Sequence, residues 1–263
     1  MKEKKENPTS GGSCNNSILR TCYILDLFTV ENEQWTLKEI AECCHISPTT
    51  AIPVLKSLEM CGYLERDANT KRYTLGIKFL EKSQIKINSI NIIDKASGIL
   101  HNFSRKYRVN THLGRLDGSD VIYLDRHEAV VHSLSPSYIG KRIPAYCSAM
   151  GKVLLAYLDE EDLAIALDNC DMKKFSINTI TDPQELRNQL EAIRHAGFSV
   201  DDEEYQTNGY CIGVPIFDVT GKVCAAISCS ITKTPENIKT IPQLKDSMIK
   251  IGKEISHGIG YDT

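Results

Sequence analysis

The sequence lacks any pair of cysteines in the C-x-x-C spacing, although it contains ten cysteines in 263 residues. Structural zinc sites and dithiol redox motifs use that spacing, so neither is expected. Cys43 and Cys44 are adjacent, and adjacent side chains cannot easily face one metal ion. Four others stand in apolar runs: Cys22, Cys61, Cys224 and Cys229. A thiol in such a run packs as a small hydrophobic group, so we expect buried, reduced thiols, no metal and no cofactor.

Long apolar runs and glycine-rich nucleotide motifs are also missing. No run approaches the length that a membrane span needs. The start, MKEKKENPTSGGSCNNS, is charged and then rich in Gly, Ser and Asn, without the apolar core of a signal peptide. There is no P-loop, no dinucleotide-binding glycine pattern and no internal repeat. The sequence therefore predicts a cytoplasmic protein without a membrane partner, in which residues 1–16 form a flexible tail.

A surplus of basic charge is absent as well. The formal net charge is −3, and residues 1–80 contain ten Lys or Arg and ten Asp or Glu. A protein that contacts many DNA phosphates usually shows a basic surplus, so any DNA contact here must come from a few locally placed cations. The 41% hydrophobic and 25% charged residues are typical of a globular protein. The length allows one large domain or two smaller ones.

Three helices are predicted in the first part of the chain. They cover Ile18–Phe28, Leu37–Cys43 and the stretch from Pro48 to Cys61. Apolar residues at helical spacing indicate the first. Thr36 and Glu39 have the spacing of a capping box, which marks the start of the second. Ser47 followed by Pro48 is a typical start for the third, with a capping hydroxyl and a proline at the first helical position.

A short hairpin is predicted directly after the third helix. Gly62 is a typical helix-ending residue, and the turn sequence DANTK separates two short strands, Tyr63–Arg66 and Arg72–Leu75. Helix, helix, turn, helix and hairpin in this order predict a winged helix-turn-helix over residues 17–76.

Pro53 stands inside the third predicted helix and has two possible consequences. If Pro48 is the first helical residue, Pro53 is the sixth, and its missing N–H leaves the Thr49 carbonyl unpaired. In a regular helix this costs about 3 kcal/mol. If Thr50 is instead the capping residue, Pro53 falls in the first turn, where no donor is needed. We therefore predict either a kink at Pro53 or a late helix start.

The remaining sequence predicts a helix over residues 77–91 and a second domain over residues 92–263. Four strand-like runs, THLGRL, DVIYLD, CIGVPIF and KVCAAISCSI, are joined in part by DG and TG turns. Helices are predicted to start at Ser148, Asp159 and Asp182, and another runs through Leu244 and Ile255. Antiparallel strands with segregated helices predict an α+β domain.

The run TLKEIAECCHISPTTAIPVLKSLEMCGYLERDANTKRYTLG resembles the DNA-binding domain of the isocitrate-lyase-regulator (IclR) family of bacterial transcription factors. Three later segments are similar to the same family's effector domain: IGKRIPAYCSAMGKVLLAYL, NTITDPQELRNQLEAIRHAGFSVDDEE and CIGVPIFDVTGKVCAAISCSI. The resemblance covers nearly everything from Ser17 to Ile255.

This resemblance implies a winged helix-turn-helix, a linker helix over residues 77–91 and a GAF-like effector-binding and oligomerisation domain over residues 92–263. It also implies a homodimer or tetramer on a palindromic double-stranded DNA operator, regulated by a small organic acid. The expected function is therefore a DNA-binding transcriptional regulator and not an enzyme. In the family a basic residue is usual at the position of Pro53.

Seven residues are candidates for DNA contact because they are polar or basic and belong to the third helix or the hairpin. They are Ser47, Thr49, Thr50, Lys56, Arg66, Lys71 and Arg72. The helix residues are expected to meet phosphates or base edges, and the hairpin residues to follow the DNA backbone.

The segment SAMGKVLL has a physical reason to bind an anion. At a helix start the amides of Ala149, Met150 and Gly151 lack internal partners, and the helix dipole favours negative charge. The resemblance implies effector contacts at Ile143, Ala149, Met150, Asp201, Cys211, Ser228 and Ser230. Ser228 and Ser230 alternate along a strand, so both hydroxyls face one side. Asp201 is suited to accept a hydrogen bond from a ligand hydroxyl.

Two further hypotheses come from the residues. Cys147 or Cys211 with a histidine could form the nucleophile pair of a small-molecule-processing enzyme, although no local signature supports it. The apolar stripes on Ile18–Phe28 and Ile92–Tyr107 offer more apolar surface than one small domain needs, which predicts dimerisation.

Overall fold

The computed structural model describes residues 16–88, 91–129 and 137–262. The chain divides into two compact units, residues 1–88 and 89–263, and each is described by itself. The flexible tail expected over residues 1–16 lies outside the described residues, except that Asn16 is the first residue of a helix.

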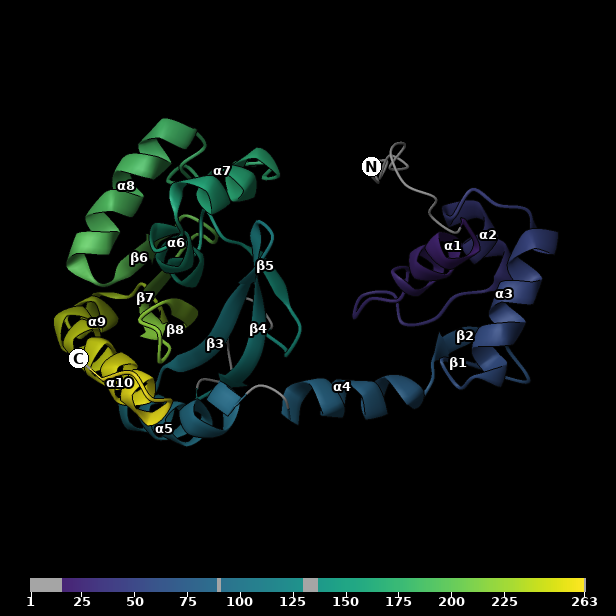
Figure 1. Ribbon diagram of the computed structural model, residues 1–263, viewed down its shortest axis with the longest axis horizontal. Coiled ribbons are helices and arrows are strands. Elements are labelled where there is room, and N and C mark those ends of the chain that lie inside the picture. The colour runs from purple at the N-terminus through teal and green to yellow at the C-terminus, as the bar shows by residue number, and fades with distance from the viewer. Residues whose placement is uncertain (1–15, 89–90, 130–136, 263) are drawn as a thin grey trace. The chain divides into compact units, whose positions relative to one another are not determined.

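The first unit is a winged helix-turn-helix followed by one more helix (Figure 1). Its elements are α1 (Asn16–Leu25), α2 (Leu37–Cys43), α3 (Pro48–Met60), β1 (Leu64–Arg66), β2 (Tyr73–Leu75) and α4 (Lys78–Asn88). The predicted fold is confirmed, and both hydrogen bonds of the Thr36–Glu39 capping box are present. Ile24, Ile40 and Leu55 pack in the core that these helices share.

Helix α3 starts at Pro48, so the alternative of a late start is wrong. The Oγ atom of Ser47 accepts the Thr50 N–H at 3.2 Å, which makes Ser47 the capping residue. The helix continues without interruption past Pro53, whose side chain is exposed. A kink at Pro53 stays a prediction.

The second unit consists of one six-stranded antiparallel sheet with helices on both faces. Its strands are β3 (Asn110–Asp117), β4 (Asp120–His127), β5 (Arg142–Pro144), β6 (Ser199–Asp202), β7 (Gly209–Phe217) and β8 (Val223–Thr232), in the order β5-β4-β3-β8-β7-β6. Its helices are α5 (Asn91–Tyr107), α6 (Ala149–Ala156), α7 (Glu160–Asp168), α8 (Pro183–Ala196), α9 (Pro235–Ile238) and α10 (Ile241–Gly258). The α+β prediction is confirmed. The short elements β5, β6 and α9 were not predicted.

Helices α5 and α10 cover one face of the sheet, and α6 covers the other, with α8 packed on α6 (Figure 1). Ile92, Ala96, Leu100 and Phe103 of α5 are buried against the sheet. Most of the Ile92–Tyr107 stripe is therefore used in packing within the second unit, with Ile99 and Tyr107 only partly buried, and dimerisation stays a prediction. By contrast, Ile18 of α1 is 62% exposed.

No helix within residues 16–88, 91–129 and 137–262 combines the length and apolar character that a membrane span requires. In the same ranges, no three His, Cys, Asp or Glu side chains gather as a metal site would need. The nine cysteines of the described chain are free thiols. Cys22 and Cys61 are exposed, so the expectation that they are buried is wrong: Cys22 lies on α1, and Cys61 caps the end of α3.

Candidate functional site

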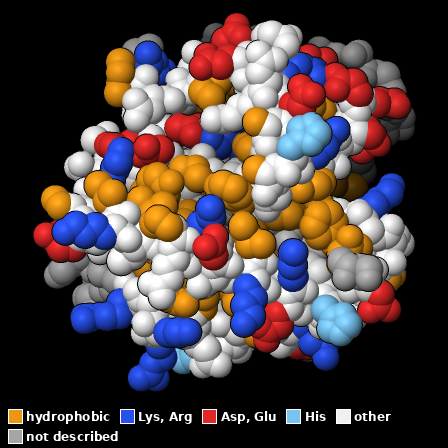
Figure 2. Space-filling model, turned by 90° about the vertical axis from the view of Figure 1, so that its left-hand side faces the viewer, with side chains coloured by type: hydrophobic (Ala, Val, Ile, Leu, Met, Phe, Trp, Pro, Cys, Tyr) orange, Lys and Arg blue, Asp and Glu red, His pale blue; other side chains and the backbone are white. Residues whose placement is uncertain are grey.

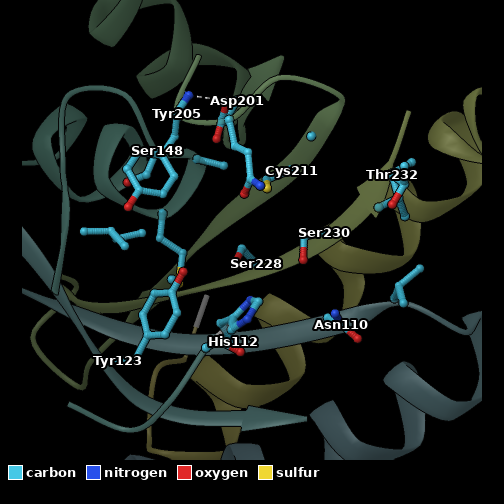
Figure 3. Close-up of a pocket in the computed structure, with 18 of the residues that line it drawn as sticks. Asn110, His112, Tyr123, Ser148, Asp201, Tyr205, Cys211, Ser228, Ser230 and Thr232 are labelled. Carbon is cyan, nitrogen blue, oxygen red and sulfur yellow. Dashed lines mark hydrogen bonds between the residues drawn. The ribbon is translucent and has the colours of Figure 1, made fainter. Parts of the chain in front are cut away.

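A cavity of about 480 Å³ lies in the second unit, between one face of the sheet and the start of α6 (Figure 3). All seven residues expected to contact an effector line it: Ile143, Ala149, Met150, Asp201, Cys211, Ser228 and Ser230. They come from β5, α6, β6, β7 and β8. Residues far apart in the sequence thus form one wall because the strands that hold them are neighbours in the sheet.

The strand register explains why the polar side chains meet. Asp201 pairs with Cys211, Cys211 pairs with Ser230, and Ser230 pairs with Asn110, so one row crosses β6, β7, β8 and β3. Residues paired in this way lie on the same face of a sheet. Ser228 belongs to the next row on that face, because residues two apart on a strand point the same way.

The start of α6 forms one end of the cavity, and Thr232 at the end of β8 lies toward the other. The Oγ atom of Ser148 accepts the Gly151 N–H at 3.2 Å, so the amide of Gly151 is already capped. The prediction that three free amides face a ligand is therefore wrong for Gly151. Ala149 and Met150 remain, and both line the cavity with Ser148.

Gly213 of β7 sets the position of this helix start. A Cβ atom at Gly213 would lie 2.5 Å from the Ala149 carbonyl oxygen and 2.9 Å from the Met150 nitrogen. Only glycine allows such close approach of two backbones. The hydroxyl of Ser199 on β6 also donates to the Ala149 carbonyl, which ties α6 to the sheet edge.

Asp201 is engaged in local structure as well as facing the cavity. Its Oδ1 atom accepts the Glu204 N–H at 2.8 Å and the Tyr205 N–H at 3.3 Å. Burial, together with the nearby Glu204 carboxylate, raises the pKa of Asp201 to about 7. The carboxyl can thus donate a hydrogen bond as well as accept one near neutral pH, whereas the sequence predicted an acceptor only.

Lys152 and Glu204 form an ion pair beside the cavity that the sequence did not predict. Lys152 of α6 has no exposed surface, and Glu204 is 5% exposed. Burial raises the pKa of Glu204, while the Lys152 ammonium opposes that rise. The pair joins α6 to the segment that follows β6, and so it fixes two walls of the cavity relative to each other.

His112 and Tyr123 are further polar residues of the cavity that the sequence analysis missed. Their rings lie 4.8 Å apart, and both residues are less than a tenth exposed. Burial lowers the pKa of His112 to about 4, so this ring is neutral at physiological pH. Asn110 and His112 alternate on β3 as Ser228 and Ser230 do on β8, and this period of two was the available signal.

The start of α3 presents a cluster of hydroxyls in the first unit. The Ser47 Oγ lies 2.7 Å from the Thr49 Oγ1 and 2.8 Å from the Thr50 Oγ1. Lys56 is exposed two turns further along the helix. Ile52, which the sequence analysis did not single out, is 47% exposed between them. Because 49, 52 and 56 follow helical spacing, these side chains form one outward face.

The three basic hairpin residues have different surroundings. Arg66 lies over the ring of Tyr73, 5.3 Å from its centre, and Lys71 is exposed beside the turn. Arg72 donates to the Gln34 carbonyl at 3.2 Å and pairs with Glu39 at 3.4 Å. The structure therefore ties Arg72 to the start of α2, and its expected phosphate contact stays a prediction.

Comparison with known proteins agrees with this architecture. The IclR helix-turn-helix domain matches residues 17–68, and the family described as bacterial transcriptional regulator IclR C-terminal matches residues 84–257. The HTH-type transcriptional regulator XynR of Escherichia coli is 30% identical over 93% of this chain and 97% of its own length. The chain belongs to the IclR family of bacterial transcriptional regulators.

Solved structures of IclR-family proteins have the same fold. The Thermotoga maritima IclR is 32% identical, with a TM-score of 0.75 over 94% of this chain and 99% of that protein. An IclR homolog from Microbacterium hydrocarbonoxydans, crystallised in complex with 4-hydroxybenzoate, has a TM-score of 0.82 over 93% of this chain and 99% of its own. At 21% identity, the latter likeness is one of fold.

Proposed function

We propose that this IclR-family regulator binds a double-stranded operator through α3 and the β1–β2 hairpin, and that a small organic acid in the cavity of the second unit alters that affinity. The observation that carries the proposal is the cavity itself. It combines a helix start with buried polar side chains in a protein whose family regulates transcription. Preformed cavities with a few convergent polar groups are typical ligand sites.

On the DNA side, we assign the outward face of α3 to the major groove. Thr49, Thr50 and Ser47 are suited to phosphates or base edges at the helix start, and Lys56 to a phosphate. The exposed Ile52 is suited to the methyl group of a thymine. Arg66 and Lys71 are placed to follow the backbone from the hairpin, while Arg72 supports the start of α2.

On the ligand side, we assign the carboxylate to the start of α6 and the other polar groups to the sheet. The amides of Ala149 and Met150 and the helix dipole favour the anion. Asp201, Cys211, Ser228 and Ser230 form the polar wall, and Ile143 with Met150 closes the apolar side. The complex of the Microbacterium homolog with a hydroxylated aromatic acid supports an acid as the class of ligand.

We further propose a homodimer formed by the first unit, on a palindromic operator. The apolar side chains of Ile77, Leu80 and Ile85 are each more than 60% exposed on or beside α4, as is Ile18 on α1. Such exposure favours burial against a second copy. Figure 2 shows apolar side chains in a band across one face of the second unit, which is compatible with pairing of dimers into tetramers.

The enzyme alternative is not favoured by the chemistry of the thiols. Burial raises the pKa of both Cys147 and Cys211 far above the usual range, so neither is a thiolate at neutral pH. The buried His112 is a weak base, because its pKa is lowered to about 4. A regulator of bacterial transcription acts where the chromosome is, so we expect the protein in the cytoplasm.

The test has a DNA arm and a ligand arm. Genomic fragments retained by the protein define an operator, and fluorescence anisotropy then gives its affinity. We expect Lys56→Ala to weaken operator binding severalfold and to lower its salt dependence, whereas the exposed second-unit variant Lys253→Ala does neither. Failure of the protein to retain any fragment would contradict the DNA assignment.

For the ligand arm, thermal shift against small organic acids identifies a binder, since a ligand of the folded state raises the midpoint. The double variant Ser228→Ala/Ser230→Ala should then weaken that ligand by about 0.5–1.5 kcal/mol for each hydroxyl. Its operator affinity without ligand should be unchanged. If the double variant binds the acid normally, the serines do not have the proposed role.

A further inference from the structure

Four polar side chains beyond the seven positions discussed above line the cavity at the start of β3, at the end of β8 and in the segment that follows β8. They are Asn110, Thr232, Asn237 and Thr240. The Asn237 side-chain amide donates to the Thr232 carbonyl at 2.8 Å, and the Thr240 hydroxyl donates to the Asn237 carbonyl at 2.7 Å. These bonds hold Thr232, Asn237 and Thr240 in a fixed arrangement before any ligand arrives.

Three hydroxyls follow one another along β8 on the cavity side: Ser228, Ser230 and Thr232 (Figure 3). Since they occupy alternate residues of a strand, the row is about 13 Å long. Within the described part of the chain, none of the three hydroxyls has a hydrogen bond to another protein group. Ser228 is only 4% exposed. Buried polar groups of a protein are normally paired, so this row is suited to a ligand with several hydrogen-bonding groups.

Other unpaired polar atoms face the same space. The His112 ring and the Tyr123 hydroxyl have no hydrogen bond to another described residue, although both residues are less than a tenth exposed. His112 pairs with Ser228 across β3 and β8, so its ring adds to the polar row at the end near α6. The neutral ring can accept one hydrogen bond and donate another.

The length and polarity of this row discriminate between classes of acid. A two- or three-carbon acid held at α6 is too short to reach Thr232 along a row of about 13 Å. An aromatic acid presents flat apolar faces, so the buried Ser228 hydroxyl would stay unpaired, at about 1–3 kcal/mol, and the half-buried Ser230 and Thr232 would gain no partner. A straight-chain acid with a hydroxyl on most carbons can pair with each of them.

We infer that the ligand is an elongated polyhydroxylated carboxylic acid, a sugar acid in its chemistry, and this inference rests on the proposed function. Its carboxylate lies at the start of α6, and its far hydroxyls bind Thr232 and Asn237. Thr232, Asn237 and Asn110 then form a second subsite that determines specificity for chain length.

Isothermal calorimetry on the full-length protein tests this inference with D-gluconate, benzoate and pyruvate. We expect D-gluconate to bind at least tenfold more tightly than either other acid. Thr232→Val, which keeps the side-chain shape, should weaken D-gluconate by about two- to twelvefold, the loss expected for one neutral hydrogen bond. Thr207→Val, at an exposed position in the β6–β7 connection, is the matched control and should leave binding unchanged.

Each outcome discriminates. If benzoate or pyruvate binds more tightly than D-gluconate, this inference is overturned and the proposed function stays intact. The same holds if a folded Thr232→Val variant binds D-gluconate as tightly as the wild type does. Lack of binding by all three acids, together with a failed thermal-shift screen of other acids, would overturn the proposed function too. Thermal unfolding of each variant without ligand identifies any loss of binding caused by misfolding.

Discussion

The ammonium group of Lys152 and the Oε1 atom of Glu204 form an ion pair in the interior of the second unit, where Lys152 has no exposed surface. The Oε2 atom of Glu204 has no hydrogen-bond partner among the described residues. Lys152 is therefore the main source of compensation for this buried carboxylate, and the backbone of Asp202 is a lesser one. The pair connects α6 with the segment after β6, which are two walls of the cavity.

Lys152→Met should destabilise the protein by about 3–5 kcal/mol, because it leaves a buried carboxylate without its counter-charge. Chemical denaturation measures the loss. Lys38→Met is the matched control, since Lys38 and Glu42 form an exposed pair at 3.9 Å and such pairs contribute little. Equal unfolding free energies for the two variants would show that the buried pair has no special role.

Asp201 should make the stability of the second unit depend on pH. Its pKa is about 7 in the folded protein, against about 3.9 in an unfolded chain. The folded state thus binds a proton more tightly, so stability falls as pH rises from about 4 to about 7 and is constant above that. The difference in unfolding free energy between wild type and Asp201→Asn should decrease over the same pH range, by on the order of 4 kcal/mol. A difference that does not change between pH 5 and pH 8 would contradict it.

Pro53→Ala should stabilise the first unit by about 2 kcal/mol. The substitution restores an N–H for the Thr49 carbonyl and removes the ring from an unbroken helix, and the greater freedom of the unfolded chain offsets part of the gain. Thermal unfolding followed by circular dichroism measures the change. Ile52→Ala, at the neighbouring exposed position, is the control and should shift the midpoint little. A lower midpoint for Pro53→Ala would mean that the helix depends on the proline.

Gly213→Ala should disturb the cavity. The added Cβ would lie 2.5 Å from the Ala149 carbonyl oxygen, and backbone on both sides must shift to accommodate it. We expect a loss of about 1–3 kcal/mol in stability and weaker binding of the acid. The control is Gly98→Ala in α5, where a Cβ meets nothing within 4 Å and should stabilise the helix by about 0.5–1 kcal/mol. If the unfolding midpoints of Gly213→Ala and Gly98→Ala move in the same direction, the close backbone approach at Gly213 does not explain the effect.

The parts of the fold that could be predicted are those encoded by neighbouring residues. The Thr36–Glu39 box starts α2, and Asp182 with Glu185 starts α8, as their spacing indicated. Gly197 ends α8 with a φ of 74°, a conformation that glycine adopts without strain. Each signal lies within four residues of the structure that it specifies, so the sequence alone was sufficient.

Contacts between distant residues could not be predicted. Nothing near Arg72 indicates its hydrogen bond to Gln34, and nothing near Lys152 indicates Glu204. The raised pKa of Asp201 depends on burial, which is a property of the assembled sheet. The cavity positions were expected from a resemblance, and the physical reasoning about free amides failed at Gly151 because Ser148 caps it.

Near the end of strand β8, alternate residues face the cavity and the hydrophobic core. Ser228, Ser230 and Thr232 face the cavity, whereas Ile227 and Cys229 pack in the core beneath α5 and α10. Positions 228, 230 and 232 can therefore change to suit a new ligand, while positions 227 and 229 stay fixed to preserve folding. The C-terminal half of this strand thus gives the protein a means of evolving new specificities without loss of stability, since residues that face the ligand there alternate with residues that face the core.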